Sequence, residues 1–95
     1  MPEMRFNIRW PDATGESCYS PSLVIREHFV PGETYALDDF LARSRAALTI
    51  ASDRVKARYG FACSLAMGQL ARIEARGVQF ASASQSRGTL ESFEE

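Results

Sequence analysis

Alternating hydrophobic and polar residues open the chain. The apolar positions are Met4, Phe6, Ile8 and Trp10. A period of two places one face of a β-strand on a core. The turn sequence PDATGE follows, in which we expect Gly15 to take a positive φ, and residues 17–20 return as a second strand. The pattern predicts a β-hairpin in which either Cys18 or Tyr19 points inward.

The segment from Pro21 to Phe29 fits two local structures. Ser20 followed by Pro21 is typical of a helix N-cap and first helical position, and the apolar residues up to Phe29 could line one side of a short helix. Its β-branched and aromatic residues are also compatible with a strand. We therefore expect a short extra helix or strand before the turn at Pro31.

Two later stretches repeat apolar residues at helical spacing. The first stripe consists of Leu37, Phe40, Leu41, Ser44, Leu48, Ala51 and Val55. The second consists of Ala62, Leu65, Ala66, Gln69, Leu70 and Ile73. Gly60 supplies a left-handed stop between them and Gly77 ends the second. This spacing predicts two antiparallel helices whose facing stripes, with Leu65 among them, form the core.

From Ala81 the chain reads ASASQSRGTLESFEE, which is poor in apolar residues and rich in Ser and Glu. Such a segment buries too little surface to offset the entropy of ordering it. A chain of 95 residues fits one small domain. We predict a single α+β domain over residues 1–77, a β-hairpin packed on an antiparallel helical pair, and a flexible, acidic, Ser-rich tail over residues 78–95.

Composition is that of an ordinary globular protein, with 45% hydrophobic residues, 24% charged residues and a net charge of -1. No apolar run approaches the roughly 18 to 20 residues needed to cross a bilayer, and the N-terminus lacks a secretory pattern. We expect a cytoplasmic protein without membrane contact. Its two cysteines, Cys18 and Cys63, should then be free thiols.

Cys63 is the candidate for thiol chemistry. Helical spacing puts it beside Leu70, at the margin of the apolar stripe, where it would act as a small buried hydrophobe. The first turn of a helix also favours a thiolate, so a reactive thiol is the alternative, and a bond to Cys18 is a third. His28, the single histidine, has no partner at metal-ligand spacing, and no CxxC, HExxH or glycine-rich phosphate loop occurs. We expect neither a metal nor a cofactor.

Charge is distributed unevenly along the chain. Residues 37–77 carry seven basic and four acidic side chains, while both flanks are net negative. The basic residues are Arg43, Arg45, Arg54, Lys56, Arg58, Arg72 and Arg76. They could meet phosphate, as in a helix-turn-helix, or an acidic protein, although an excess of three charges is small for nucleic acid. We place the expected partner surface at Arg54, Arg58, Tyr59 and Arg72.

Several segments carry a family resemblance. They are MRFNIRWPD, CYSPS at residues 18–22, DFLARSRAAL, and IASDRVKARYGFACS, which includes RYGFACS at residues 58–64. From Met4 to about Ala75 the chain resembles a family of small bacterial nitrogen-starvation response proteins. Genes of that family typically lie in clusters with a nitrilase-like enzyme, which implies a role in nitrogen metabolism, and the resemblance transfers no catalytic residue.

These observations favour a non-catalytic accessory or regulatory protein of a nitrogen-starvation or nitrilase-cluster pathway. We expect it to act by protein–protein association, as a homodimer and with a nitrilase-cluster enzyme as a partner. The alternative is a small thiol-dependent enzyme or redox sensor that uses Cys63. A nucleic-acid-binding module is the least favoured class.

Overall fold

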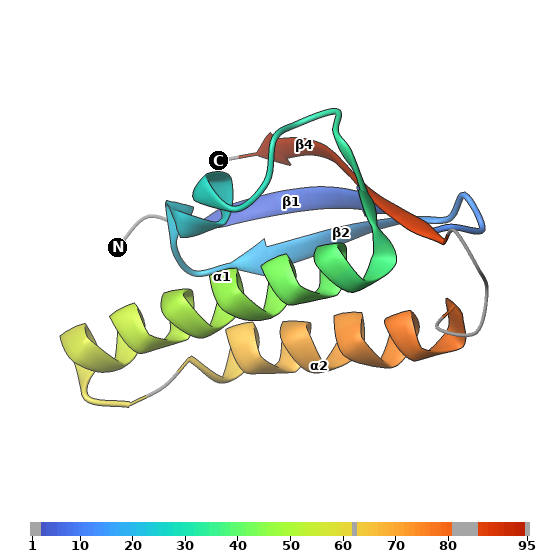
Figure 1. Ribbon diagram of the computed structural model, residues 1–95. Helices are drawn as coiled ribbons and strands as arrows, with labels where there is room; N and C mark the ends of the chain where they lie inside the picture. Colours follow the sequence, from blue (N-terminus) through green and yellow to red (C-terminus); the bar gives the residue numbers. More distant parts are fainter. Residues whose placement is uncertain (1–2, 62, 81–85, 95) are drawn as a thin grey trace.

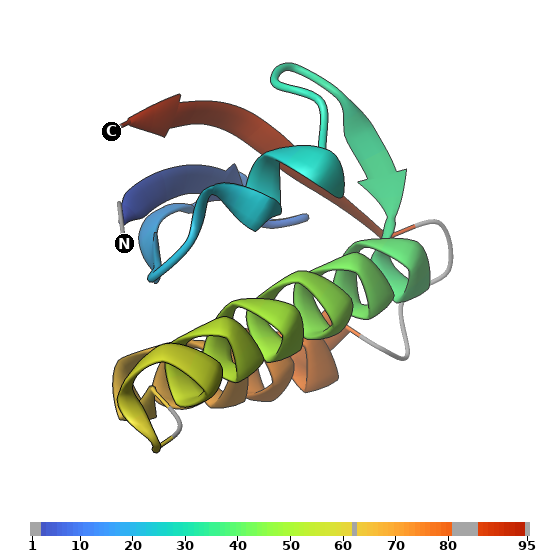
Figure 2. The ribbon, with the colours of Figure 1, turned by 90° about the vertical axis from the view of Figure 1, so that its left-hand side faces the viewer.

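The computed structural model describes residues 3–61, 63–80 and 86–94. A four-stranded antiparallel sheet forms one layer and two long helices form the other (Figures 1 and 2). The elements are β1 (Met4–Arg9), β2 (Gly15–Ser20), the 3-10 helix η1 (Leu23–Glu27), β3 (Thr34–Ala36), α1 (Leu37–Tyr59), α2 (Ser64–Phe80) and β4 (Arg87–Glu94). The predicted α+β class is confirmed.

The N-terminal hairpin forms as predicted, with Phe6 opposite Cys18 and Arg9 opposite Gly15. Cys18 is fully buried on the core side, which settles the choice between it and Tyr19. The positive φ falls at Ala13, with a value of 71°, and not at Gly15. Hydrogen bonds between Trp10 and both Ala13 and Thr14 close the turn early, so Gly15 already belongs to the extended strand.

The segment after the hairpin is helical, although only as the short 3-10 helix η1. Its N-cap is Ser22, whose Oγ accepts a hydrogen bond from the Val24 N–H at 3.3 Å. The prediction that Ser20 is the cap is therefore wrong. Ser20 instead donates its hydroxyl proton to the Ser22 carbonyl at 2.7 Å, because its side chain points into the core from β2.

The two long helices pack antiparallel, as predicted (Figure 1). Gly60 ends α1 in the left-handed conformation, with φ 89°, and its N–H donates to the Lys56 carbonyl. Arg45 of α1 pairs with Glu74 of α2 at 3.0 Å. Near the far end of the pair, a Cβ added to Gly77 would lie 2.7 Å from Leu41 Cδ1. Glycine thus allows the helices a close approach there.

The buried face of α2 differs from the predicted stripe. Leu65 is 66% exposed, and Ala62 lies outside the described residues. The buried positions of α2 are Ala66, Gln69, Leu70, Ile73 and Gly77. They recur at intervals of three or four residues, whereas Leu65 stands 100° around the helix from Ala66. The assignment of Leu65 to the core is therefore wrong.

The C-terminal segment is a strand, not a flexible tail, over residues 87–94. Strand β4 lies between β1 and β3 and pairs antiparallel with both. Its Leu90 is fully buried. Pairing on both sides satisfies the backbone N–H and C=O groups, so a strand with few apolar side chains can still be ordered. Residues 78–80, also assigned to the tail, belong to α2.

Aromatic side chains fill the space between the sheet and the helices. Trp10 of the hairpin meets Phe40 of α1 edge-on at 5.8 Å and stacks with Phe80 of α2 at 5.9 Å. Phe29 also packs against Phe40, with 5.4 Å between the ring centres. The helical pair extends past the sheet at its turn, which gives the molecule a long axis of 41 Å against 22 and 17 Å (Figure 2).

Candidate functional site

Large apolar side chains are exposed where the helical pair turns. We call Tyr59, Phe61, Leu65 and Met67 the hairpin end. Their exposed fractions are 54%, 71%, 66% and 42%. The left-handed Gly60 ends α1 and α2 begins at Ser64, so the chain reverses within a few residues beyond the sheet (Figure 1). The hairpin end is a surface that the core of this chain does not cover.

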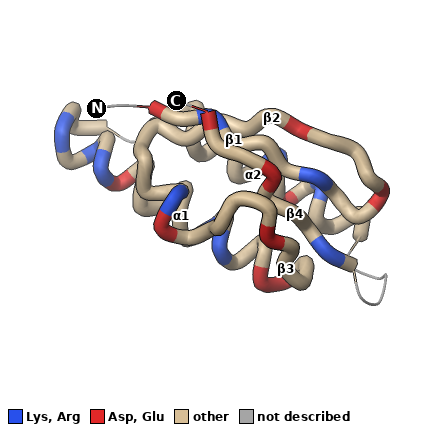
Figure 3. Tube along the Cα trace, turned by 90° about the horizontal axis from the view of Figure 1, so that it is seen from above, with Lys and Arg blue, Asp and Glu red and all other residues tan. Residues whose placement is uncertain are grey.

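Basic side chains flank the hairpin end. Arg54, Lys56 and Arg58 are exposed on the last turns of α1, with Asp53 as the neighbouring acid (Figure 3). The guanidinium carbon of Arg58 lies 5.8 Å from the centre of the Tyr59 ring. These groups give the apolar surface a rim with more positive than negative charge.

Three of the four predicted partner-surface residues, Arg54, Arg58 and Tyr59, therefore lie at this end of α1. Arg54 also reaches the Ser22 hydroxyl, at 3.2 Å from Nη1 to Oγ. Arg72 lies elsewhere, about two helical turns into α2. Its Nη2 donates to Gln69 Oε1 at 3.2 Å. The structure thus divides the predicted surface between two places.

Gln69 connects α2 to the edge of the sheet. Its Oε1 also accepts the Tyr19 N–H at 3.0 Å. Its Nε2 is buried without a partner among the described residues. Beside this contact, Arg72, Arg76, Thr14 and Glu16 border a hollow of about 500 Å³.

Three basic residues of the middle segment have acidic partners. Arg43 pairs with Asp39 at 2.9 Å, and Arg45 pairs with Glu74 at 3.0 Å. Arg76 lies 3.7 Å from Asp12 and donates to the Thr14 hydroxyl at 2.7 Å.

Cys63 lies immediately before α2, whereas we expected it in the first turn. It is half-buried, and its carbonyl accepts the Met67 N–H at 3.2 Å. Its own N–H donates to Ser52 Oγ of α1 at 3.2 Å. The residue thus ties the start of α2 to α1 through its backbone. Cys18 is fully buried, and desolvation raises the pKa of its thiol to about 12.

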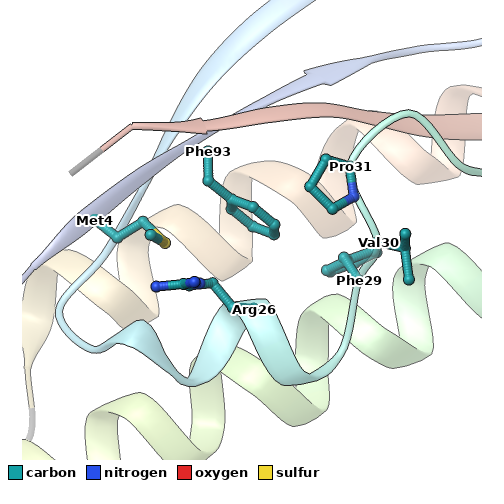
Figure 4. Close-up of a pocket in the computed structure, with 6 residues that line it drawn as sticks. All are labelled: Met4, Arg26, Phe29, Val30, Pro31 and Phe93. Carbon is teal, nitrogen blue, oxygen red and sulfur yellow. The ribbon is translucent and has the colours of Figure 1, made fainter.

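A second hollow lies where η1 approaches the ends of β1 and β4 (Figure 4). It has a volume of about 480 Å³ and is lined by Met4, Arg26, Phe29, Val30, Pro31 and Phe93. Sequence reasoning missed it because these residues come from four separate segments. Sequence reasoning also missed Phe61 and Met67 as surface residues. In RYGFACS one aromatic residue precedes Gly60 and one follows it, and this pattern was a signal for an exposed apolar turn.

Metal-ligand geometry is absent from the part of the chain that the structure describes: no three His, Cys, Asp or Glu side chains could hold an ion. Nor is any helix among those residues long and apolar enough to cross a membrane.

A family model described as nitrogen starvation-induced protein NitG matches residues 5–93. The match includes β4, which the resemblance in the motifs did not reach. Comparison with curated proteins and comparison with solved structures each gave no match.

Proposed function

The chain belongs to the nitrogen starvation-induced protein family NitG, and on this premise we propose that it is a non-catalytic accessory or regulatory protein. In this proposal it acts in the cytoplasm and binds another protein through the hairpin end.

The observation that carries the proposal is the exposure of four large apolar side chains at one end of the molecule. Exposed apolar groups that gather in one place mark interaction surfaces more often than single ones do. Aromatic residues, Met and Arg are also the types enriched at the centres of protein interfaces. The hairpin end and its neighbours Arg54 and Arg58 have this composition.

The chemistry of the rim points to the kind of partner. Arg54, Lys56 and Arg58 are exposed on the adjoining turns of α1, so a complementary surface has an apolar part and acidic side chains beside it. The resemblance to proteins of nitrilase-containing gene clusters leads us to expect an enzyme of such a cluster as this partner.

We also propose a homodimer. Support comes from α1, where Ala42, Ala46, Thr49 and Ile50 border an exposed hollow of about 440 Å³. Small side chains on one helical face allow a second helix to approach closely. Light scattering over a tenfold dilution should show twice the mass of 10.6 kDa, and a monomer at every concentration would contradict the dimer.

A thiol-dependent enzyme or redox sensor is the second candidate function. The observation in its favour is that Cys63 is a free cysteine, is only partly buried and stands directly before α2. Iodoacetamide labelling of native Cys63 faster than that of an unstructured cysteine peptide would support this candidate, and slower labelling would count against it.

The experiment for the main proposal is a tagged pull-down from nitrogen-starved cells. Wild type should retain a specific enzyme, and Phe61→Ser or Leu65→Ser should lose it, because each removes exposed apolar surface from the hairpin end. Val78→Ser is the matched control, since Val78 is 73% exposed and lies at the other end of α2. Equal capture by wild type and Phe61→Ser, or equal loss in Val78→Ser, would contradict the assignment.

A further inference from the structure

We propose that the hollow between α2 and the turn joining β1 to β2 binds a free amino acid, with its carboxylate on α2 and its ammonium group on β2. The hollow has a volume of about 500 Å³, and its charged described lining residues are Arg72, Arg76 and Glu16. The other described lining residues are small or uncharged: Thr14, Gly15, Ala75 and Gln79. Opposite charges on the two walls match a small molecule that carries both charges. The site lies on the second half of α2, away from the hairpin end.

The α2 wall has more hydrogen-bond donors than acceptors. Arg72 donates from Nη2 to Gln69 Oε1 at 3.2 Å, but its Nε and Nη1 have no partner in the part of the chain that the structure describes, and no carboxylate there pairs with it. Arg72 is an exposed residue, so a ligand can reach it from solvent. Beside it, Gln69 Nε2 and Arg76 Nε are buried without a hydrogen-bond partner among the described residues. Since buried polar groups are nearly always bonded, this excess of donors favours an anionic group at the α2 wall.

The β2 wall offers an acceptor. Glu16 Oε1 accepts the Trp10 indole N–H at 2.9 Å, while Glu16 Oε2 has no partner among the described residues. Trp10 is almost completely buried, so this bond holds the Glu16 carboxylate at the edge of the core. A carboxylate binds a protonated amine through charge-assisted hydrogen bonds. The ammonium group of the ligand therefore lies at Glu16 Oε2.

Contacts of Arg76 join the two walls. Its Nη2 donates to the Thr14 hydroxyl at 2.7 Å and lies 3.7 Å from a carboxylate oxygen of Asp12. Asp12 compensates the charge of Arg76, which leaves Arg72 as the guanidinium for the ligand's carboxylate. Because the fold already holds the turn against α2, little further ordering is needed when a ligand binds.

A nuclear magnetic resonance titration of the full chain with L-alanine at neutral pH tests this site. We expect saturable shifts of the Gly15, Glu16 and Arg72 amides, with an affinity on the order of millimolar for so small a ligand. Propionate has the same carbon skeleton without the ammonium group, and L-alaninamide lacks the carboxylate. Each analogue should bind about tenfold more weakly than alanine, because each loses one of the two charge-assisted contacts.

Two variants assign the two ends of the ligand. Arg72→Gln should weaken alanine binding about tenfold and remove the advantage of alanine over alaninamide. Glu16→Gln should also weaken it about tenfold and remove the advantage over propionate, while its amide oxygen can still accept the Trp10 N–H. Arg58→Gln, at an exposed arginine of α1 outside the hollow, is the matched control and should bind as wild type does.

Four results would overturn the proposal. They are equal affinity for alanine and either analogue, unchanged alanine binding by Arg72→Gln or Glu16→Gln, weakened binding by Arg58→Gln, and the absence of saturable shifts at the three amides.

Discussion

Gly88→Ala tests the placement of β4 against the core. A Cβ added at Gly88 would lie 2.7 Å from Cγ and 2.8 Å from Cδ2 of the Phe40 ring. Ordinary carbon contacts are about 3.5 to 4.0 Å, so the methyl group requires a shift of close to 1 Å. The Phe40 ring is fully buried and packs against both Trp10 and Phe29. Neither the ring nor the central strand can easily yield.

Overpacking of this kind costs about 1 to 3 kcal/mol, and alanine recovers roughly 0.4 to 1 kcal/mol by restricting the unfolded chain. The balance is a loss of up to about 2.5 kcal/mol of unfolding free energy. For a domain of this size that corresponds to a fall in Tm of up to roughly 20 °C. A flexible tail would give the opposite sign, because only the effect on the unfolded chain would remain.

Thermal and urea unfolding, followed by circular dichroism, measure this loss. Gly68→Ala is the control, since its Cβ would meet only Arg72 Nη1, at an ordinary 3.7 Å. There alanine should stabilise α2 by about 0.5 to 1 kcal/mol. In a Phe40→Leu background the added methyl at Gly88 meets a smaller side chain, so the second change should cost less. A Gly88→Ala protein as stable as wild type or more so would refute the packing of β4 on Phe40.

Three further predictions follow from burial. Leu65→Ala should change the unfolding free energy by less than about 0.5 kcal/mol, because Leu65 is mostly exposed. Leu48→Ala removes a fully buried side chain and should cost about 2 to 5 kcal/mol. Equal losses for the two variants in urea unfolding would mean that α2 turns a different face, with Leu65 on it, towards the core. Burial raises the pKa of the Cys18 thiol from 9.0 to about 12. Between pH 9 and 12 the thiol therefore ionises in the unfolded chain but not in the folded one, so the wild type should lose stability as the pH rises through this range. Cys18→Ala should lose less stability over the same range, because it has no thiol at this position. Iodoacetamide should modify native Cys63 more slowly than an unstructured cysteine peptide, and Cys18 more slowly still; faster labelling of Cys63 than of the peptide would favour the thiol-enzyme hypothesis.

Local patterns in the sequence were sufficient for the hairpin and the helical pair. The alternation around Phe6 and Ile8 places side chains on one face whatever the rest of the chain does, because the strand period is two. Gly60 ends α1 because a residue without Cβ takes a positive φ at little cost. These outcomes depend on residues within a few positions of one another, so the sequence alone could predict them.

The surface and the sites depended on tertiary packing. Helical spacing placed Leu65 within one turn of the buried positions, but only the angle at which α2 meets α1 and β2 decided that Ala66 faces inward and Leu65 outward. Likewise Arg72 and Arg58 belong to one basic segment, yet the antiparallel path of the helices sends them to different places. Linear charge counting cannot detect this, because it contains no distances.

Strand β4 shows most clearly what the sequence by itself left open. The segment RGTLESFE has few apolar residues, and composition therefore predicted a tail. Its order comes from β1 and β3, which supply hydrogen-bonding partners on both sides and bury Leu90 in a core built by residues far away in the chain. The sequence determined which segments could form strands and helices, since those preferences are local. The tertiary structure decided which polar segment completes the sheet and which apolar side chains stay in solvent, because both depend on long-range contacts that no local pattern contains.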